Sequence, residues 1–115
     1  MENKKTYQKI NNKIKKFSED RDWSQFHDPK NLALSLVLEA SEVLELYQWT
    51  KDNQLNPRRS EKISEELADV FYWVIMLSNY YNIDLLDALD KKLDKNMEKY
   101  PIKKANGSSA KYNEL

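Results

Sequence analysis

The stretch NLALSLVLEASEVLELYQWT, residues 31–50, decides the fold, because apolar side chains occur on nearly every side of the helix that it predicts. A helix that is apolar all round belongs in the middle of a helical bundle. Asp28 is a good N-cap and Pro29 suits the first helical position, so we expect a central helix over about residues 29–49. Its apolar residues include Leu32, Leu34, Leu36, Val37, Leu38, Val43, Leu44 and Leu46.

Two acid pairs interrupt the apolar sequence. Glu39 and Glu42 lie in the central helix, and Glu66 and Asp69 lie in the apolar stretch SEELADVFYWVIML, residues 64–77. A spacing of three residues puts both carboxylates of a pair on one helix face. A buried charge without a partner is costly, so two such pairs on packed helices predict a four-carboxylate site for a divalent cation. The alternative is that both pairs are ordinary acid pairs on the surface of a helix and bind no metal.

The ligand set favours particular metals. All four side chains offer oxygen, which suits Mg²⁺ or Mn²⁺ better than Zn²⁺. Neither pair contains the Glu-x-x-His of di-iron bundles, which argues against that alternative. Glu45 and Glu65 flank the pairs; either is a candidate water-activating base, and surface exposure is the alternative for each.

Composition bounds the class of protein. The chain has 115 residues, 33% of them charged, with a formal net charge of zero, which gives no general attraction to nucleic acid or membranes. It has no Cys, hence no disulfide and no cysteine nucleophile. The N-terminal sequence is not a secretory signal and no apolar run would span a bilayer, so we expect a cytoplasmic protein.

The chain predicts a single all-α domain over residues 1–115, folded as a four-helix bundle. One Gly and three Pro leave little turn chemistry for β-hairpins. Apolar spacing predicts helices over about residues 6–18, 29–49, 60–81 and 84–100. Asn82 can adopt a left-handed turn and Asp84 can cap the fourth helix. The tail, about residues 103–115, should be mobile or docked on another subunit.

Three tryptophans lie near the acid pairs. Trp49 lies on roughly the same face of the central helix as Glu42, Trp73 follows Asp69 by one turn, and Trp23 precedes the central helix. Core packing is the usual role of such residues. An aromatic wall on which a flat base stacks is the functional alternative.

Three polar residues are further candidates for substrate contacts. His27 is the only histidine, and its closeness to Trp23 allows a base or sugar contact as well as a structural role. Lys92 and Asn96 are one helical turn apart in a basic run, so they could hold a phosphate together or simply face water.

At these residues the chain resembles the MazG-like, all-α nucleotide pyrophosphohydrolases. The resemblance rests on EASE at residues 39–42, ELAD at residues 66–69, the segment from RDWSQFHDPKNL to YQW (residues 21–49), KLDKNMEKYP at residues 92–101 and the final KYNEL. Within the family, the dCTP pyrophosphatases are the most similar group. Such enzymes hydrolyse nucleoside triphosphates to monophosphate and pyrophosphate and assemble as dimers or tetramers.

The resemblance implies a role for each matching position. The acid pairs would bind Mg²⁺, the segment from Trp23 to His27 would contact substrate, and Trp49 would face the base. Two departures concern base preference, because Trp73 replaces a tyrosine and Ile14 replaces a histidine. The implied substrate-binding residues are Trp23, Ser24, Gln25, Phe26, His27, Trp49, Asp69, Trp73, Lys92 and Asn96.

We therefore expect a Mg²⁺-dependent enzyme that splits a (deoxy)nucleoside triphosphate, with dCTP or a modified dCTP favoured, in nucleotide-pool sanitation. Carboxylates would repel a triphosphate unless a metal ion lay between them, so the residues themselves also favour this chemistry. Two alternatives remain at this point. One is the same fold acting on dUTP or a phosphoribosyl nucleotide, and the other is a non-catalytic helical module that binds a nucleotide or a partner helix.

Overall fold

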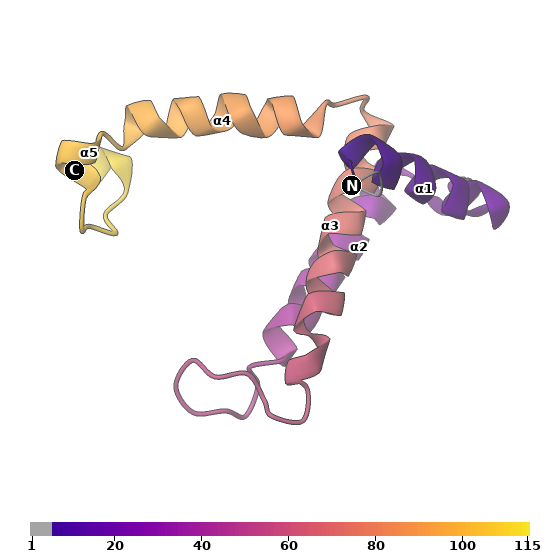
Figure 1. Cartoon of the computed structure of the whole chain (residues 1–115), viewed down its shortest axis with the longest axis horizontal. Coiled ribbons are helices and arrows are strands. Elements are labelled where there is room, and N and C mark those ends of the chain that lie inside the picture. Colours follow the sequence, from indigo (N-terminus) through magenta and orange to yellow (C-terminus); the bar gives the residue numbers. More distant parts are fainter. Residues whose placement is uncertain (1–5) are drawn as a thin grey trace. The chain divides into compact units, whose positions relative to one another are not determined.

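The computed structural model describes residues 6–115, which contain helices and no strand (Figure 1). The all-α prediction is confirmed. The chain divides into two compact units, the first ending at Asn82 and the second spanning Ile83–Leu115, and each is described by itself. The single domain and the closed four-helix bundle that the sequence predicts stay predictions. No helix in the described range is long and apolar enough to cross a membrane.

The first unit is built on three long helices, α1 (Tyr7–Asp20), α2 (Pro29–Glu45) and α3 (Ile63–Tyr80). Short 3₁₀ helices, η1 (Trp23–Phe26) and η2 (Ser60–Lys62), precede α2 and α3. Asp28 caps α2 as predicted, since its Oδ1 accepts a hydrogen bond from the Asn31 backbone N–H at 2.8 Å.

Helices α2 and α3 run alongside each other and make the most extensive packing in the first unit (Figure 1). The buried apolar residues here are Leu32 in α2, Leu46 directly after α2, and Ile75 and Met76 in α3. The described residues of the first unit leave the other side of α2 uncovered, where Val37 is 64% and Leu44 71% exposed. The expectation that α2 lies wholly inside a bundle is therefore not met within the described part of the first unit.

Helix α2 ends four residues before the predicted end at Trp49. The backbone N–H groups of Leu46, Tyr47 and Gln48 bond to carbonyls only three residues back, which tightens the chain into successive turns. Trp49 then adopts a left-handed conformation with φ of 65°. The loop is closed by Thr50, whose hydroxyl oxygen lies 2.7 Å from the Tyr47 carbonyl oxygen and 2.8 Å from the Gln54 carbonyl oxygen, so its one proton can be donated to either.

The second unit contains α4 (Leu85–Lys99), α5 (Ile102–Ala105) and the 3₁₀ helix η3 (Tyr112–Glu114). Asp84 caps α4, as predicted, by accepting from the Asp87 N–H at 3.1 Å. The C-terminal segment folds back on the end of α4, where the Tyr112 ring lies 6.3 Å from the Tyr100 ring and 4.8 Å from the Lys99 ammonium. Docking of this tail on another subunit stays a prediction.

Candidate metal centre

Helices α2 and α3 bring three carboxylates together. Glu39 and Glu42 project from α2 and Glu66 from α3, and one oxygen from each lies within 4.8 Å of the other two. The three-residue spacing on α2 and the close packing of α3 produce this arrangement, as the sequence predicts. We call these three residues the carboxylate cluster.

Asp69, the fourth predicted ligand, lies beside the cluster and is exposed. Its charge raises the pKa of both Glu39 and Glu66, and it lines the same hollow as Glu39. Three acids therefore meet directly, and the fourth is close enough to add to their mutual repulsion.

The electrostatics of the cluster are unfavourable without a cation. A hydrogen bond with the Glu42 carboxyl, then burial, then the neighbouring acids raise the pKa of Glu39 from 4.5 to about 7. Burial, followed by the charges of Glu42 and Asp69, raises the pKa of Glu66, and Lys62 offsets this only in part. The cluster and the neighbouring Asp69 thus favour protonation or a bound cation over four free carboxylates.

Two oxygens of the cluster also lack partners. The Oε2 atoms of Glu39 and Glu66 are buried, and neither has a hydrogen-bond donor within the described residues. A buried acceptor left without a donor is expensive. The all-oxygen ligand set and these two partnerless acceptors fit a hard divalent cation. The cluster could therefore hold a divalent metal ion.

A hollow of about 370 Å³ adjoins the cluster. Its walls are largely aromatic, because the Phe17 ring meets the Trp23 ring edge-on at 5.5 Å and the Tyr72 ring meets the Trp73 ring at 4.9 Å. Acidic and aromatic groups thus share one recess, the combination expected for a flat base attached to phosphates. Its lining residues are Ile10, Lys13, Ile14, Phe17, Trp23, Glu39, Asp69, Tyr72 and Trp73.

Sequence reasoning missed two contributors to this hollow. The Tyr72 hydroxyl is buried without a partner in the described chain, and burial raises its pKa. Its signal was present, because it follows Asp69 by three residues and therefore shares a helix face with it. The other contributor is most of the α1 face, namely Ile10, Lys13 and Phe17, which join Ile14, the one position on this helix that the resemblance connects with base preference. No local pattern shows where that helix packs.

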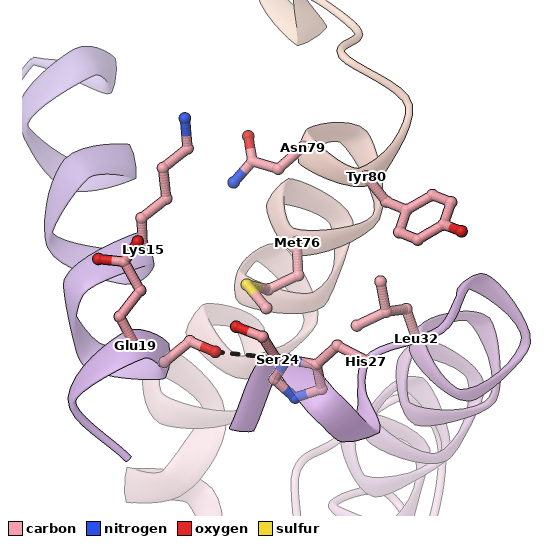
Figure 2. Close-up of a pocket in the computed structure, with 9 residues that line it drawn as sticks. Lys15, Glu19, Ser24, His27, Leu32, Met76, Asn79 and Tyr80 are labelled. Atoms are coloured by element: carbon pink, nitrogen blue, oxygen red, sulfur yellow. Dashed lines mark hydrogen bonds between the residues drawn. The ribbon is translucent and has the colours of Figure 1, made fainter. Parts of the chain in front are cut away.

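The segment from Trp23 to His27 is divided between two places. Trp23 lines the hollow beside the carboxylates, whereas Ser24 and His27 line a second hollow of about 300 Å³ (Figure 2). His27 Nδ1 lies 3.4 Å from the hydroxyl oxygen of buried Ser18, and the His27 ring meets Trp73 edge-on at 5.8 Å. The described residues of this segment therefore do not line one common hollow, and their contacts to substrate stay predictions.

Two other members of the segment face neither hollow. Gln25 Nε2 donates to the Asp22 backbone carbonyl and carboxylate at 3.0 and 3.1 Å. Phe26 is 60% exposed, and its carbonyl accepts from Asn31 Nδ2. Their contacts to substrate stay predictions.

Trp49 is not on α2 and is 86% exposed, so the argument that placed it on the face of Glu42 is wrong. The turns after Glu45 explain the difference. Its contact with a base, which the resemblance implies, stays a prediction. Trp73 does lie next to the cluster, since it lines both the aromatic hollow and a recess shared with Glu39 and Glu42.

Lys92 and Asn96 lie one turn apart on α4 in the second unit, with Lys92 exposed and Asn96 half-buried. Their contact with phosphate stays a prediction. Both candidate bases are exposed; Glu45 lines the recess that contains Glu39 and Glu42, and Glu65 lies in the first turn of α3.

The chain is similar in sequence to known proteins. A family model described as the MazG-like family matches residues 34–115. The chain is 38% identical over 104 residues to dCTP pyrophosphatase 1 of Mus musculus and 41% identical over 104 residues to that of Homo sapiens. Each alignment covers 86% of this chain and 61% of the relative, so the chain spans about three fifths of the length of these curated relatives.

A solved structure is also similar. A pyrophosphatase from Archaeoglobus fulgidus superposes with a TM-score of 0.76 at 34% sequence identity. The match covers 82% of this chain and 91% of that one. The sequence comparison and the structural comparison therefore both give pyrophosphatases as proteins similar to this chain.

Proposed function

The chain belongs to the MazG-like family, and from this premise we propose that it is a Mg²⁺-dependent nucleoside triphosphate pyrophosphohydrolase. The observation that carries the proposal is the carboxylate cluster, in which two buried oxygens lack donors. In it, the hydrogen bond with Glu42, then burial, then the neighbouring acids raise the pKa of Glu39 to about 7. Such a cluster is tolerable when a doubly charged ion sits among its oxygens. Mn²⁺ would satisfy the same ligands.

Each group would have a separate task. Glu39, Glu42 and Glu66 would hold the metal ion, with Asp69 as the fourth acid at the edge of the hollow. When bound, Mg²⁺ neutralises phosphate charge and lowers the pKa of coordinated water. The aromatic walls of the hollow would hold the base, so the α-phosphate would face the acids that also line it.

The reaction transfers a nucleotidyl group to water. A water oxygen attacks the α-phosphorus, the bond from that phosphorus to the bridging oxygen breaks, and pyrophosphate leaves. A free carboxylate accepts the proton from the water. Glu45 is the favoured acceptor because it shares a recess with Glu39 and Glu42.

For the substrate we propose dCTP or a modified dCTP, supported by the names of the relatives from Mus musculus and Homo sapiens. The protein would then remove unwanted nucleotides from the cytoplasmic pool. The runner-up substrates, dUTP and phosphoribosyl nucleotides, keep the same fold and cluster. A homo-oligomer is also proposed, supported by the apolar residues of α2 that the single chain leaves exposed.

A turnover screen tests the proposal. Canonical and modified triphosphates are incubated with the protein, with and without Mg²⁺, and pyrophosphate is measured separately from phosphate. We expect pyrophosphate release that requires the metal and is fastest with a cytosine nucleotide. Release of phosphate alone, or turnover of no nucleotide, would contradict the proposal and favour a non-catalytic binding module.

A further inference from the structure

Helix α1 forms one wall of the aromatic hollow, yet it packs much less on α3 than α2 does. Ser18 is the only buried residue of this helix. A wall with so little apolar burial needs other contacts to hold it at one distance from the opposite side.

Such a contact joins Asn11 of α1 to Asn79 of α3. Asn11 Nδ2 donates to Asn79 Oδ1 at 3.0 Å, and Asn79 Nδ2 donates to Asn11 Oδ1 at 2.7 Å. Both amides are part-buried, and each uses a donor and an acceptor in the same pair. Figure 2 shows the Asn79 amide pointing toward the helix that carries Lys15 and Glu19, which is α1.

A second polar contact holds the C-terminal end of α1. The Ser18 hydroxyl oxygen lies 3.4 Å from His27 Nδ1. Asn11 and Ser18 are seven residues apart, about two helical turns, so they lie on the same face of α1. The polar contacts of Asn11 and Ser18, on one face of α1, together fix both the rotation of the helix about its axis and its position along that axis.

This rotation decides which side chains reach the hollow. Ile10, Ile14 and Phe17 line the hollow and lie roughly a quarter turn around α1 from the face of Asn11 and Ser18, at 3.6 residues per turn. An apolar contact tolerates small rotations, whereas a reciprocal amide pair loses both hydrogen bonds when the helix turns. The amide pair is thus the more exacting constraint on the shape of the hollow.

We propose that Asn11 and Asn79 are positioning residues for nucleotide binding, because their amide pair holds α1 as the wall of the hollow. The inference rests on the proposed function, in which the hollow receives the base. Neither residue lines the aromatic hollow, so the pair acts through the helix and does not touch the base.

The test compares Asn11→Ala, Asn79→Ala and the double variant with Asn12→Ala. Asn12 is a matched control, since it is the next residue on the same helix and its side chain accepts only an exposed hydrogen bond from Gln8. We expect KM for the best nucleotide to rise roughly three- to tenfold in each single variant, the range for one net hydrogen bond, with kcat within about twofold. The double variant should be no worse than either single one, because both remove the same pair.

Hydrogen exchange of residues 7–20, measured without nucleotide, provides a readout independent of turnover. The pair predicts faster exchange in Asn11→Ala and Asn79→Ala than in Asn12→Ala, with the exchange of α2 and α3 unchanged. Equal KM values in Asn11→Ala and Asn12→Ala, or losses that multiply in the double variant, would overturn the inference. If the wild-type protein turns over no nucleotide, the proposed function fails. If hydrogen exchange of α1 in Asn11→Ala and Asn79→Ala also equals that in Asn12→Ala, the inference that the amide pair holds α1 in place fails as well.

Discussion

Replacing Glu39 with Gln should make the protein more stable in the absence of metal. The same change should abolish nearly all Mg²⁺-dependent turnover. Gln keeps the size of the side chain and removes one charge from the carboxylate cluster. The elevation of the Glu39 pKa from 4.5 to about 7 is equivalent to about 3 kcal/mol if fully expressed. Because Glu39 is only half-buried, solvent screening reduces the expected gain to about 1–2 kcal/mol.

The pH dependence of this gain has a definite sign. The folded state of the wild type binds more protons than the unfolded state between about pH 4.5 and 7, because the folded pKa of Glu39 lies above its ordinary value. Wild-type stability therefore falls as the pH rises through this window and levels off above it. The advantage of Glu39→Gln should be full at pH 8 and nearly absent at pH 4.5.

Added Mg²⁺ should reverse the order of stabilities at pH 8. The wild type gains about 2.7 kcal/mol at a free Mg²⁺ concentration one hundred times its Kd, whereas the variant has lost a ligand. Because the ligands must be ionised, the effect of Mg²⁺ on the wild type should grow as the pH rises through about 7. Turnover in the variant should fall on the order of 10²–10³-fold, comparable to removing one group that stabilises transition-state charge.

Thermal unfolding with EDTA and with Mg²⁺, at pH 4.5, 6 and 8, measures these effects, and pyrophosphate release measures turnover. About 1–2 kcal/mol corresponds to a Tm increase of about 4–8 °C for a chain of this size. Glu61→Gln is the control, since Glu61 is exposed and outside the cluster. The reasoning is refuted if Glu39→Gln keeps both its Mg²⁺-dependent Tm increase and its turnover.

Three further predictions concern binding and assembly. Trp49→Ala should raise KM and weaken base preference by about 1–3 kcal/mol, the value of a lost stacking contact, and an unchanged KM would exclude that contact. Tyr72→Phe should leave the Tm of the free protein unchanged or slightly raised, because the hydroxyl has no partner there, while KM rises about fivefold; equal KM values would mean that the hydroxyl binds no ligand. Val37→Asp should lower the mass measured by light scattering, since Val37 is 64% exposed in the single chain, and an unchanged mass would show that this side of α2 is not an interface.

The parts of the site that follow from local sequence were predictable. Capping by Asp28 and Asp84 depends on residues within one turn, and the structure confirms both caps. The meeting of Glu39 and Glu42 with Glu66 required only helical spacing and the packing of neighbouring helices. These features depend on short sequence separations, which periodicity describes well.

The remaining features depend on how turns and distant elements pack. The end of α2 at Glu45 follows from turns that tighten hydrogen bonding, although the apolar pattern continues to Leu46. The amide pair between Asn11 and Asn79 joins residues 68 positions apart, and nothing in either helix marks its partner. Sequence could therefore identify the acids of the site, and of the wall that α1 forms only Ile14, through the resemblance.

Exposure of one side of α2 connects assembly with metal binding. Leu34, Val37, Leu38 and Leu44 are each left more than half exposed by the described residues of the first unit, although burying such a side chain is worth about 1.5–3 kcal/mol. Leu38 lines the same recess as Glu39 and Glu42, so a subunit that covers it would also exclude water from the carboxylates. Excluding water strengthens both the repulsion among the acids and their attraction for a cation. Metal binding and subunit association should therefore reinforce each other, and by linkage each should strengthen the other by the same factor.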